Sequence, residues 1–153
     1  MKTLLAGACF GAVALASSIA IAAAPAQPSA AESAAIFKAA GFKAKGGKYV
    51  RCEDDVTMSY SSGRIEMEDL NGDGTSEAWV RESSTFCYGN TAEAFVLLAK
   101  DAKGGWIALL DEVGVALPLE TKHNGWRDIE VGGPGMGPFP VYRYNGKTYT
   151  RKK

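Results

Sequence analysis

Three Asn-Gly dipeptides, at positions 71–72, 124–125 and 145–146, separate short runs that are rich in β-branched and aromatic residues. Asn-Gly favours the positive φ angles of a type I′ turn, which joins two antiparallel strands through a two-residue loop. Residues 61–63 and 103–105 are two further predicted hairpin tips, because each contains glycine beside small or polar residues. Consecutive strands joined by tight turns run antiparallel and lie side by side. The sequence therefore predicts an antiparallel meander of hairpins.

The predicted strands are short β-rich runs bounded by turn residues, and they make the chain mainly β. They cover residues 48–52, 56–60, 64–68, 77–81, 94–99, 106–110, 128–131, 141–144 and 147–150. The hairpins at 95–107 and 141–149 form a weak internal repeat, each preceded by an acidic strand start. This repeat leaves a propeller-like arrangement and a partly open barrel or sandwich as alternatives.

One short helix is expected before the first strand. Ser29 and Glu32 match a capping box, in which the two side chains bind the first free amides of a helix. Residues 33–40 have high helix propensity, and Gly41 provides the usual left-handed stop. The side of this helix predicted to be buried consists of Ile36, Phe37 and Ala40.

Residues 1–24 have the outline of a secretory signal, with Lys2 followed by an apolar run from Leu4 to Ala24 that carries no charge. Small residues at the two positions that a signal peptidase reads, Ala20 and Ala22, precede a Pro-containing tail, so we expect cleavage near Ala23. The mature protein would then be periplasmic or secreted, with a tail at 25–29, a single β-rich domain at 30–153 and no membrane span. Because the apolar run is long enough to cross a bilayer, an uncleaved anchor is the alternative.

Signal cleavage would remove Cys9 and leave Cys52 and Cys87. An even number of cysteines in an oxidising compartment predicts a disulfide between them. The alternative, a metal or redox pair, lacks both C-x-x-C spacing and a nearby histidine.

The charge balance argues against nucleic acid as a partner. The 153 residues include 17 Lys and Arg and 17 Asp and Glu, for a formal net charge of +0. Electrostatic binding of nucleic acid requires clustered cations that release counterions from phosphates. With 46% hydrophobic and 22% charged residues, the composition instead fits a folded domain.

Residues 69–77 carry the pattern D-x-N-x-D-G-x-x-E, which predicts a calcium loop. Calcium takes six to eight hard oxygen ligands, and alternate positions of a tightly curled loop can direct their oxygens inward. Gly74 permits the sharp bend that such a loop requires. The predicted ligands are Asp69, Asn71, Asp73, the Thr75 carbonyl and Glu77.

The loop does not match an EF-hand. Its twelfth position is Val80 instead of a bidentate glutamate, and a strand is predicted to follow. The loop resembles those of FG-GAP and VCBS repeat proteins, which bind calcium just before a β-strand. The alternative is an Asx-rich turn, in which the Asp and Asn side chains bond their own backbone.

No motif predicts an enzyme. His123 is the only histidine, and its sequence neighbourhood indicates an exposed turn without a partner carboxylate. A hydrolase that uses Glu66, Glu68 or Asp128 is a minor hypothesis, because these carboxylates carry no recognisable catalytic spacing.

Two segments are candidates for binding a protein partner. Residues 132–140 form a Gly- and Pro-rich loop that carries Met136 and Phe139. A stiff loop loses little entropy when its apolar side chains bind. Tyr88 belongs to an aromatic turn beside Cys87. The alternatives are that Phe139 fills the core beneath its loop and that Tyr88 packs locally.

Taken together, the helix at 36–42, the acidic loop, the turn at 86–90 and the hairpin at 143–149 resemble small periplasmic proteins of Proteobacteria. The closing hairpin and the loop are similar to those of periplasmic inhibitors of invertebrate-type lysozyme and related hydrolase immunity proteins. The resemblance implies a β domain that is not an enzyme and that inserts a loop into an enzyme cleft. The leading hypothesis is therefore a calcium-binding, protein-binding module that inhibits a lysozyme-like peptidoglycan hydrolase. The alternative is an envelope structural or accessory protein in which calcium only stabilises the fold.

Overall fold

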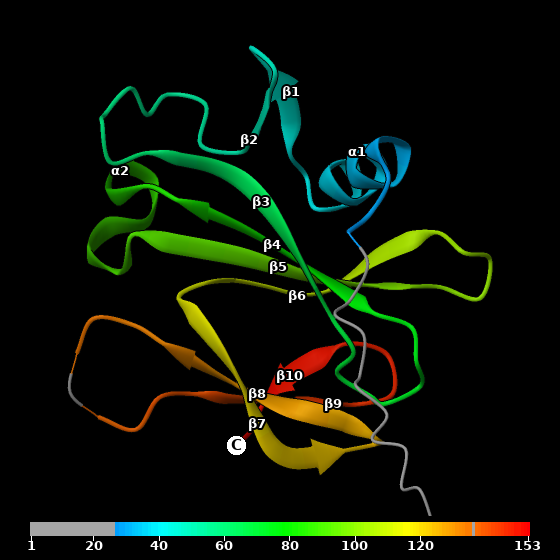
Figure 1. Ribbon diagram of the computed structural model, residues 1–153. Coiled ribbons are helices and arrows are strands. Elements are labelled where there is room, and N and C mark those ends of the chain that lie inside the picture. Colours follow the sequence, from blue (N-terminus) through cyan, green and yellow to red (C-terminus); the bar gives the residue numbers. More distant parts are fainter. Residues whose placement is uncertain (1–26, 136) are drawn as a thin grey trace, which may run out of the picture.

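Two four-stranded antiparallel sheets and one helix are stacked as layers in the computed structural model, which describes residues 27–135 and 137–153 (Figure 1). The predicted signal at 1–24 and the predicted partner residue Met136 lie outside the described residues. The elements are α1 (Ala30–Ala39), β1 (Lys43–Lys45), β2 (Lys48–Val50), β3 (Ser61–Glu68), β4 (Glu77–Ser83), α2 (Thr85–Tyr88), a 3-10 turn (Gly89–Thr91), β5 (Glu93–Lys100), β6 (Trp106–Val113), β7 (Val115–His123), β8 (Trp126–Gly132), β9 (Val141–Tyr144) and β10 (Tyr149–Arg151).

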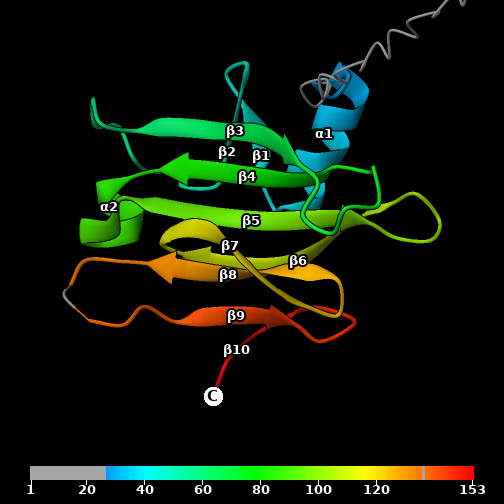
Figure 2. The ribbon, with the colours of Figure 1, turned by 60° about the horizontal axis from the view of Figure 1, so that its bottom comes forward.

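The sheet topology confirms the predicted meander. One sheet has the order β3-β4-β5-β6 and the other β10-β9-β8-β7, and every neighbouring pair is antiparallel. A separate hairpin pairs β1 with β2. The two large sheets lie one above the other (Figure 2), and the described strands do not close into a barrel. Of the predicted alternatives, the structure adopts an open two-sheet packing.

The main core lies between the two sheets. Trp79 and Phe95 of the first sheet meet edge to face with ring centroids 5.5 Å apart. Ile129 and Tyr149 of the second sheet belong to the same buried cluster. Burying such side chains stabilises the fold by about 1.5–3 kcal/mol each.

A second core lies between helix α1 and the outer face of the first sheet. Ile36 and Phe37 of α1 pack there with Ala78 and Val80 of β4. The Ser29 half of the predicted capping box is confirmed, because the Ser29 hydroxyl accepts a hydrogen bond from the Glu32 amide at 3.2 Å. The Glu32 carboxylate instead pairs with Lys100 at 2.8 Å. The predicted buried side of the helix is confirmed as well.

The turn at 124–125 has positive φ at both central residues, +51° and +84°, as a type I′ hairpin requires. The other two Asn-Gly dipeptides adopt different turns. At 145–146 only Gly146 has positive φ, and the Asn145 side chain accepts hydrogen bonds from the Lys147 and Thr148 amides. The dipeptide at 71–72 lies in the longer loop between β3 and β4.

One strand prediction and one turn prediction are wrong at residues 56–63. Residues 56–60 form a loop, and residues 61–63 lie inside β3 instead of at a hairpin tip. Gly63 is needed for packing, because a Cβ at this position would lie only 2.7–2.8 Å from the Phe42 and Phe37 rings. The glycine therefore marks a close approach between helix and strand, which a local sequence pattern does not reveal.

Strand β7 was not predicted. Pro118 lies within it, and proline is found in strands mainly at sheet edges, where its missing N–H is not needed by a neighbour. In the second sheet β7 is such an edge. The strand follows β6 after the single residue Gly114, which has φ +151°.

The predicted disulfide between Cys52 and Cys87 is confirmed, with the two Cα atoms 6.1 Å apart. It joins the loop after β2 to helix α2 across 35 residues of sequence. On the chain-entropy model, closing a loop of this length stabilises the folded state by roughly 4 kcal/mol.

We predict that Gly114→Ala lowers the free energy of unfolding by about 2–4 kcal/mol. A Cβ at this position would lie 2.5 Å from Val131 Cγ1 and 2.6 Å from the Gly132 carbonyl oxygen, at a φ that L-residues rarely adopt. Urea denaturation would measure the change. Gly133→Ala is the matched control, because its nearest neighbour would be Thr91 Oγ1 at 3.9 Å. Equal stability of the two variants would contradict the conclusion that the connection between β6 and β7 requires glycine at position 114.

Candidate functional site

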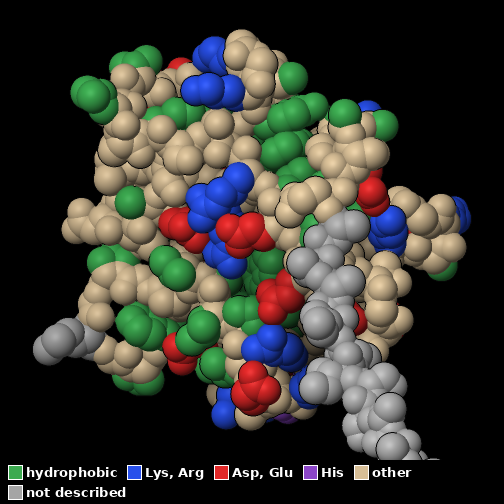
Figure 3. Space-filling view, in the orientation of Figure 1, with side chains coloured by type: hydrophobic (Ala, Val, Ile, Leu, Met, Phe, Trp, Pro, Cys, Tyr) green, Lys and Arg blue, Asp and Glu red, His purple; other side chains and the backbone are tan. Residues whose placement is uncertain are grey.

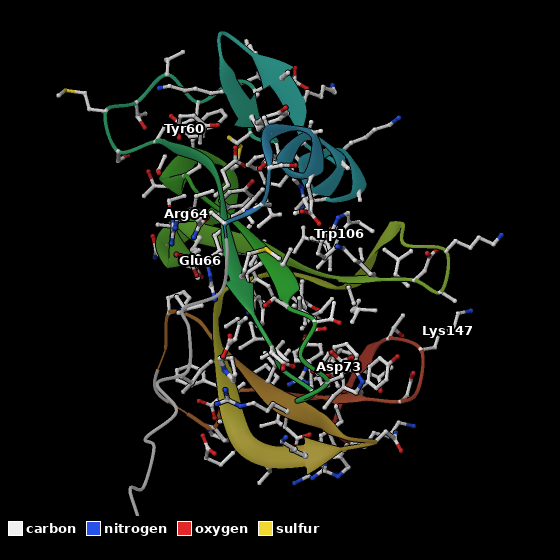
Figure 4. The ribbon with its side chains drawn as sticks, turned by 45° about the vertical axis from the view of Figure 1, so that its right-hand side comes forward. Tyr60, Arg64, Glu66, Asp73, Trp106 and Lys147 are labelled. Carbon is white, nitrogen blue, oxygen red and sulfur yellow. A yellow bond between two sulfur atoms is a disulfide. The ribbon has the colours of Figure 1, made fainter. Side chains whose placement is uncertain are left out.

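The predicted calcium loop connects β3 to β4 at one end of the first sheet. Asp73 lies on it, beside the second sheet (Figure 4). Leu70, at the start of the loop, is fully buried in the main core, and its carbonyl accepts a hydrogen bond from the Arg127 amide of β8 at 3.1 Å. The loop is therefore held by both sheets.

The first predicted ligand, Asp69, organises the loop backbone. Its two carboxylate oxygens accept hydrogen bonds from the Gly72 amide at 2.7 Å and the Gly74 amide at 2.9 Å. These bonds hold the pKa of Asp69 below its usual value. Gly72 and Gly74 have φ of +85° and +84°, so both bends use the left-handed region that glycine tolerates.

The middle of the loop is a chain of Asx turns. Asn71 Oδ1 accepts from the Asp73 amide at 2.8 Å, and Asp73 Oδ1 accepts from the Thr75 amide at 2.7 Å. The Asn71 side-chain amide also donates to Asp73 Oδ2 at 3.0 Å. The alternative reading of the motif, in which side chains bond their own backbone, thus describes the geometry of the loop in this structure.

Glu77 closes the loop at the first residue of β4 and is only 3% exposed. Its Oε2 accepts a hydrogen bond from the Leu70 amide at 2.8 Å. Burial raises the pKa of Glu77 to about 7, and the negative charges of Asp73 and Asp69 add to the increase, although the Leu70 amide opposes it. A cation placed among these carboxylates would relieve the repulsion.

The chemistry of the donor set fits calcium. Each carboxylate has about four lone-pair sites, so the observed hydrogen bonds leave further acceptor capacity on Asp69, Asp73 and Glu77. Carboxylates together with an amide or backbone oxygen are the ligands that calcium prefers. Within residues 27–135 and 137–153, however, no three Asp, Glu, His or Cys side chains are already arranged around one common ion position. Calcium binding would therefore require these side chains to reorient.

An open cavity of about 430 Å³ lies beside the loop. Four of the five predicted ligands line it, together with the β5–β6 turn and the Trp126 side chain of β8. The lining residues are Asn71, Asp73, Thr75, Glu77, Ala99, Lys100, Asp101, Ala102, Gly104 and Trp126. The structure thus places the motif in a concave site that elements distant in sequence complete.

At the opposite end of β4, the predicted partner residue Tyr88 is half-buried. Its hydroxyl donates a hydrogen bond to Glu82, a carboxylate with no exposed surface. Burial and this bond raise the pKa of Tyr88 above its usual value. Phe139, predicted to bind a partner from another loop, is 37% exposed.

Glu82, which the sequence analysis did not identify, is the acceptor of several hydrogen bonds. It accepts from the Arg51 amide at 2.9 Å, from the Cys52 amide at 3.0 Å, and from the Tyr60 hydroxyl at 2.6 Å, as well as from Tyr88. Four donors from two segments, the β2–β3 loop and α2, converge on one carboxylate. A buried carboxylate among well-placed donors holds those segments together, and losing it leaves the donors unpaired.

The expectation that His123 lacks a partner is wrong. Its Nδ1 lies 2.6 Å from Oδ1 of Asp128, a buried residue of β8 that also accepts from the Thr121 hydroxyl at 2.8 Å. The two residues are five positions apart in sequence, on opposite sides of the hairpin turn. The predicted turn at 124–125 implies cross-strand pairing, and this pairing could have predicted the contact between His123 and Asp128.

The other carboxylates considered for catalysis are engaged separately. Glu66 pairs with Arg81 at 3.1 Å and with Arg64 at 3.2 Å. Figure 3 shows cationic and anionic side chains side by side in the middle of this face, and Figure 4 places Arg64 and Glu66 on β3. Glu68 pairs instead with Arg127 at 3.1 Å. Glu66, Glu68 and Asp128 therefore have different cationic or histidine partners.

No family model, curated protein or solved structure matches this chain. Neither α1 nor α2 has the length and apolar character needed to cross a membrane.

We predict that Glu82→Gln lowers the free energy of unfolding by about 2–3 kcal/mol. The NH₂ group of the glutamine side chain would face two of the four donors. One of these two is a backbone N–H, which cannot rotate away and would be left without an acceptor. Urea denaturation would measure the loss. Glu120→Gln is the control, because that side chain is 99% exposed and its pairing with Arg127 contributes little. Similar costs at the two positions would contradict the structural role of Glu82.

Proposed function

We propose that this protein is a calcium-binding β domain of the periplasm or extracellular space that acts as a protein-binding module. Inhibition of a lysozyme-like peptidoglycan hydrolase is the specific form that we propose, on the basis of the resemblance described above. A binding role is favoured over a catalytic one, because Glu66, Glu68 and Asp128 are each engaged by different partners.

The observation that carries the calcium proposal is the environment of Glu77. This carboxylate is buried beside two other acids, and its pKa is raised to about 7. A cation would compensate both the desolvation and the like-charge repulsion. Asp69, Asn71, Asp73, Thr75 and Glu77 would hold the ion, and its role would be structural and electrostatic.

A second candidate function is supported by the position of the loop between the sheets. Leu70 is in the main core and bonds β8 through its carbonyl. Calcium at this loop would stabilise the contact between the sheets without any partner. An envelope accessory protein of this kind would be stabilised by calcium and would not slow a hydrolase.

We predict that saturating calcium raises the melting temperature of the mature protein by about 10 °C. A ligand that binds only the native state stabilises it by roughly 2.7 kcal/mol at a hundredfold excess over its dissociation constant. Differential scanning calorimetry in calcium and in chelator would measure the shift. Asp73→Ala should abolish it, because the variant loses a central ligand of the loop.

Asp101→Ala is the matched control for this experiment. Asp101 lines the same cavity but lies in the β5–β6 turn, outside the loop motif. The variant should keep the calcium shift even if its own melting temperature is lower. A wild-type protein that melts at the same temperature in calcium and chelator would contradict the calcium proposal.

A further inference from the structure

Three carboxylates line the cavity beside the β3–β4 loop, and one of them is outside the calcium motif. Asp73 and Glu77 belong to the loop and the start of β4, whereas Asp101 belongs to the β5–β6 turn. This turn, the loop and the hairpin tips of the second sheet lie at the same end of the molecule (Figures 1 and 2). Among the described residues, no Lys, Arg or His pairs with any of the three, although carboxylates elsewhere on the sheets pair with arginines. The cavity therefore concentrates negative charge.

The lysines near the cavity leave most of this charge unbalanced. Lys100 lines the cavity, but its Nζ pairs with Glu32 of α1 at 2.8 Å and lies 5.2 Å from the centre of the Trp106 ring. Lys103 and Lys147, in the neighbouring turns, are exposed and do not line the cavity. The lining thus has three carboxylates and one ammonium group, and that ammonium group is already paired. A concave site with such an excess of one sign attracts a ligand of the opposite sign.

The aromatic wall of the cavity suits an organic cation. Tyr144 packs on the Trp126 ring with centroids 4.6 Å apart, and Tyr149 meets it edge-on at 6.4 Å. These contacts hold the indole in place, and Trp126, which is half-buried, lines the cavity. An indole ring offers no oxygen ligand to calcium, whereas its face attracts ammonium and guanidinium groups.

The size of the cavity points to the same class of ligand. A volume of about 430 Å³ is within the range of small-molecule sites. A calcium ion contacts its ligands at about 2.3–2.6 Å and would fill only the part of this space next to the loop. A guanidinium group is planar, stacks on aromatic faces and has five N–H donors that match the oxygens of carboxylates.

We propose that this cavity binds a small organic cation, a guanidinium or ammonium group on an alkyl stem. The charged group faces the carboxylates of Asp73, Glu77 and Asp101, and the stem lies against Trp126. The site goes beyond the proposed function, because Asp101 and Trp126 are outside the calcium motif. A free small molecule and the side chain of a protein partner can both supply this chemistry, and the test separates the two sources.

The test is an NMR titration of the isotope-labelled mature protein in chelator, followed at the backbone amide of Gly104, which lines the cavity. The main probe is n-butylguanidinium, and n-butylurea is its neutral analogue of nearly the same shape. A blocked Gly-Arg-Gly peptide presents the guanidinium group as a protein side chain does. N-acetylglucosamine tests for a neutral ligand that would use the indole ring without the charge.

Asp101→Asn and Trp126→Leu are the site variants. Asparagine should preserve the turn, because Asp101 accepts from the Lys103 and Gly105 amides through Oδ1 alone, and an amide oxygen can accept both bonds. Asp54→Asn is the matched control, since it removes the same charge from an exposed side chain that does not line the cavity.

We expect n-butylguanidinium to bind at least about tenfold more tightly than n-butylurea, because each nearby carboxylate attracts the charge. Asp101→Asn should weaken this binding about fivefold and Trp126→Leu about threefold, whereas Asp54→Asn should leave it unchanged. Peptide binding as tight as that of n-butylguanidinium would identify the side chain of a protein partner as the source, and weaker peptide binding would identify a free small molecule.

Two results would overturn the inference. One is equal binding of n-butylguanidinium and n-butylurea, or binding of N-acetylglucosamine alone. The other is guanidinium binding that Asp101→Asn leaves unchanged, because the cation would then lie outside this cavity.

Calcium makes this inference separable from the proposed function. Saturating calcium should weaken guanidinium binding by at least about threefold, because both cations use Asp73 and Glu77. Unchanged guanidinium binding in calcium would overturn the assignment of these two carboxylates to the site. Guanidinium binding without a calcium-dependent melting shift would support the inference and contradict the calcium proposal, and a calcium shift without guanidinium binding would do the reverse.

Discussion

Strand β4 is covered on both faces, and the rest of the structure depends on this burial. Trp79 faces the core between the sheets, whereas Ala78 and Val80 face helix α1. A strand buried on both faces cannot slip in register without moving apolar side chains out of two cores. Its two ends are therefore fixed in position, and each end carries a buried glutamate, Glu77 at the predicted calcium loop and Glu82 beside the disulfide.

The two glutamates illustrate how neighbours decide the role of a buried carboxylate. Glu82 receives four hydrogen bonds, from two backbone amides and two tyrosine hydroxyls, and so stabilises the loop and helix around it. Glu77 receives a hydrogen bond from the Leu70 amide and faces the charges of Asp69 and Asp73. The first environment is complete with protein donors alone, whereas the second would gain from a cation. Strand β4 thus carries a structural carboxylate, Glu82, at one end and a candidate cation ligand, Glu77, at the other.

Local patterns were sufficient where the structure depends on neighbours in sequence. The Ser29 cap, the Asn124-Gly125 turn and the antiparallel connection of successive strands were predicted correctly, because each depends on a few adjacent residues. The loop at 56–60 was mistaken for a strand, since the anchors that hold it come from Glu82 and Ser84, more than twenty residues away. Similarly, β7 was missed because its proline is tolerated only at a sheet edge.

The sequence by itself determined the class of fold, the cysteines that pair and the loop with calcium-type spacing, because composition, turn residues and motif spacing are local properties. Only the tertiary structure decided which carboxylates are buried, that the loop opens onto a cavity shared with Trp126, and that Val56, Met58 and Phe86 are exposed to solvent. The physical reason is that burial, and with it the pKa of Glu77 and the exposure of an apolar side chain, is set by segments far apart in the chain that folding brings together.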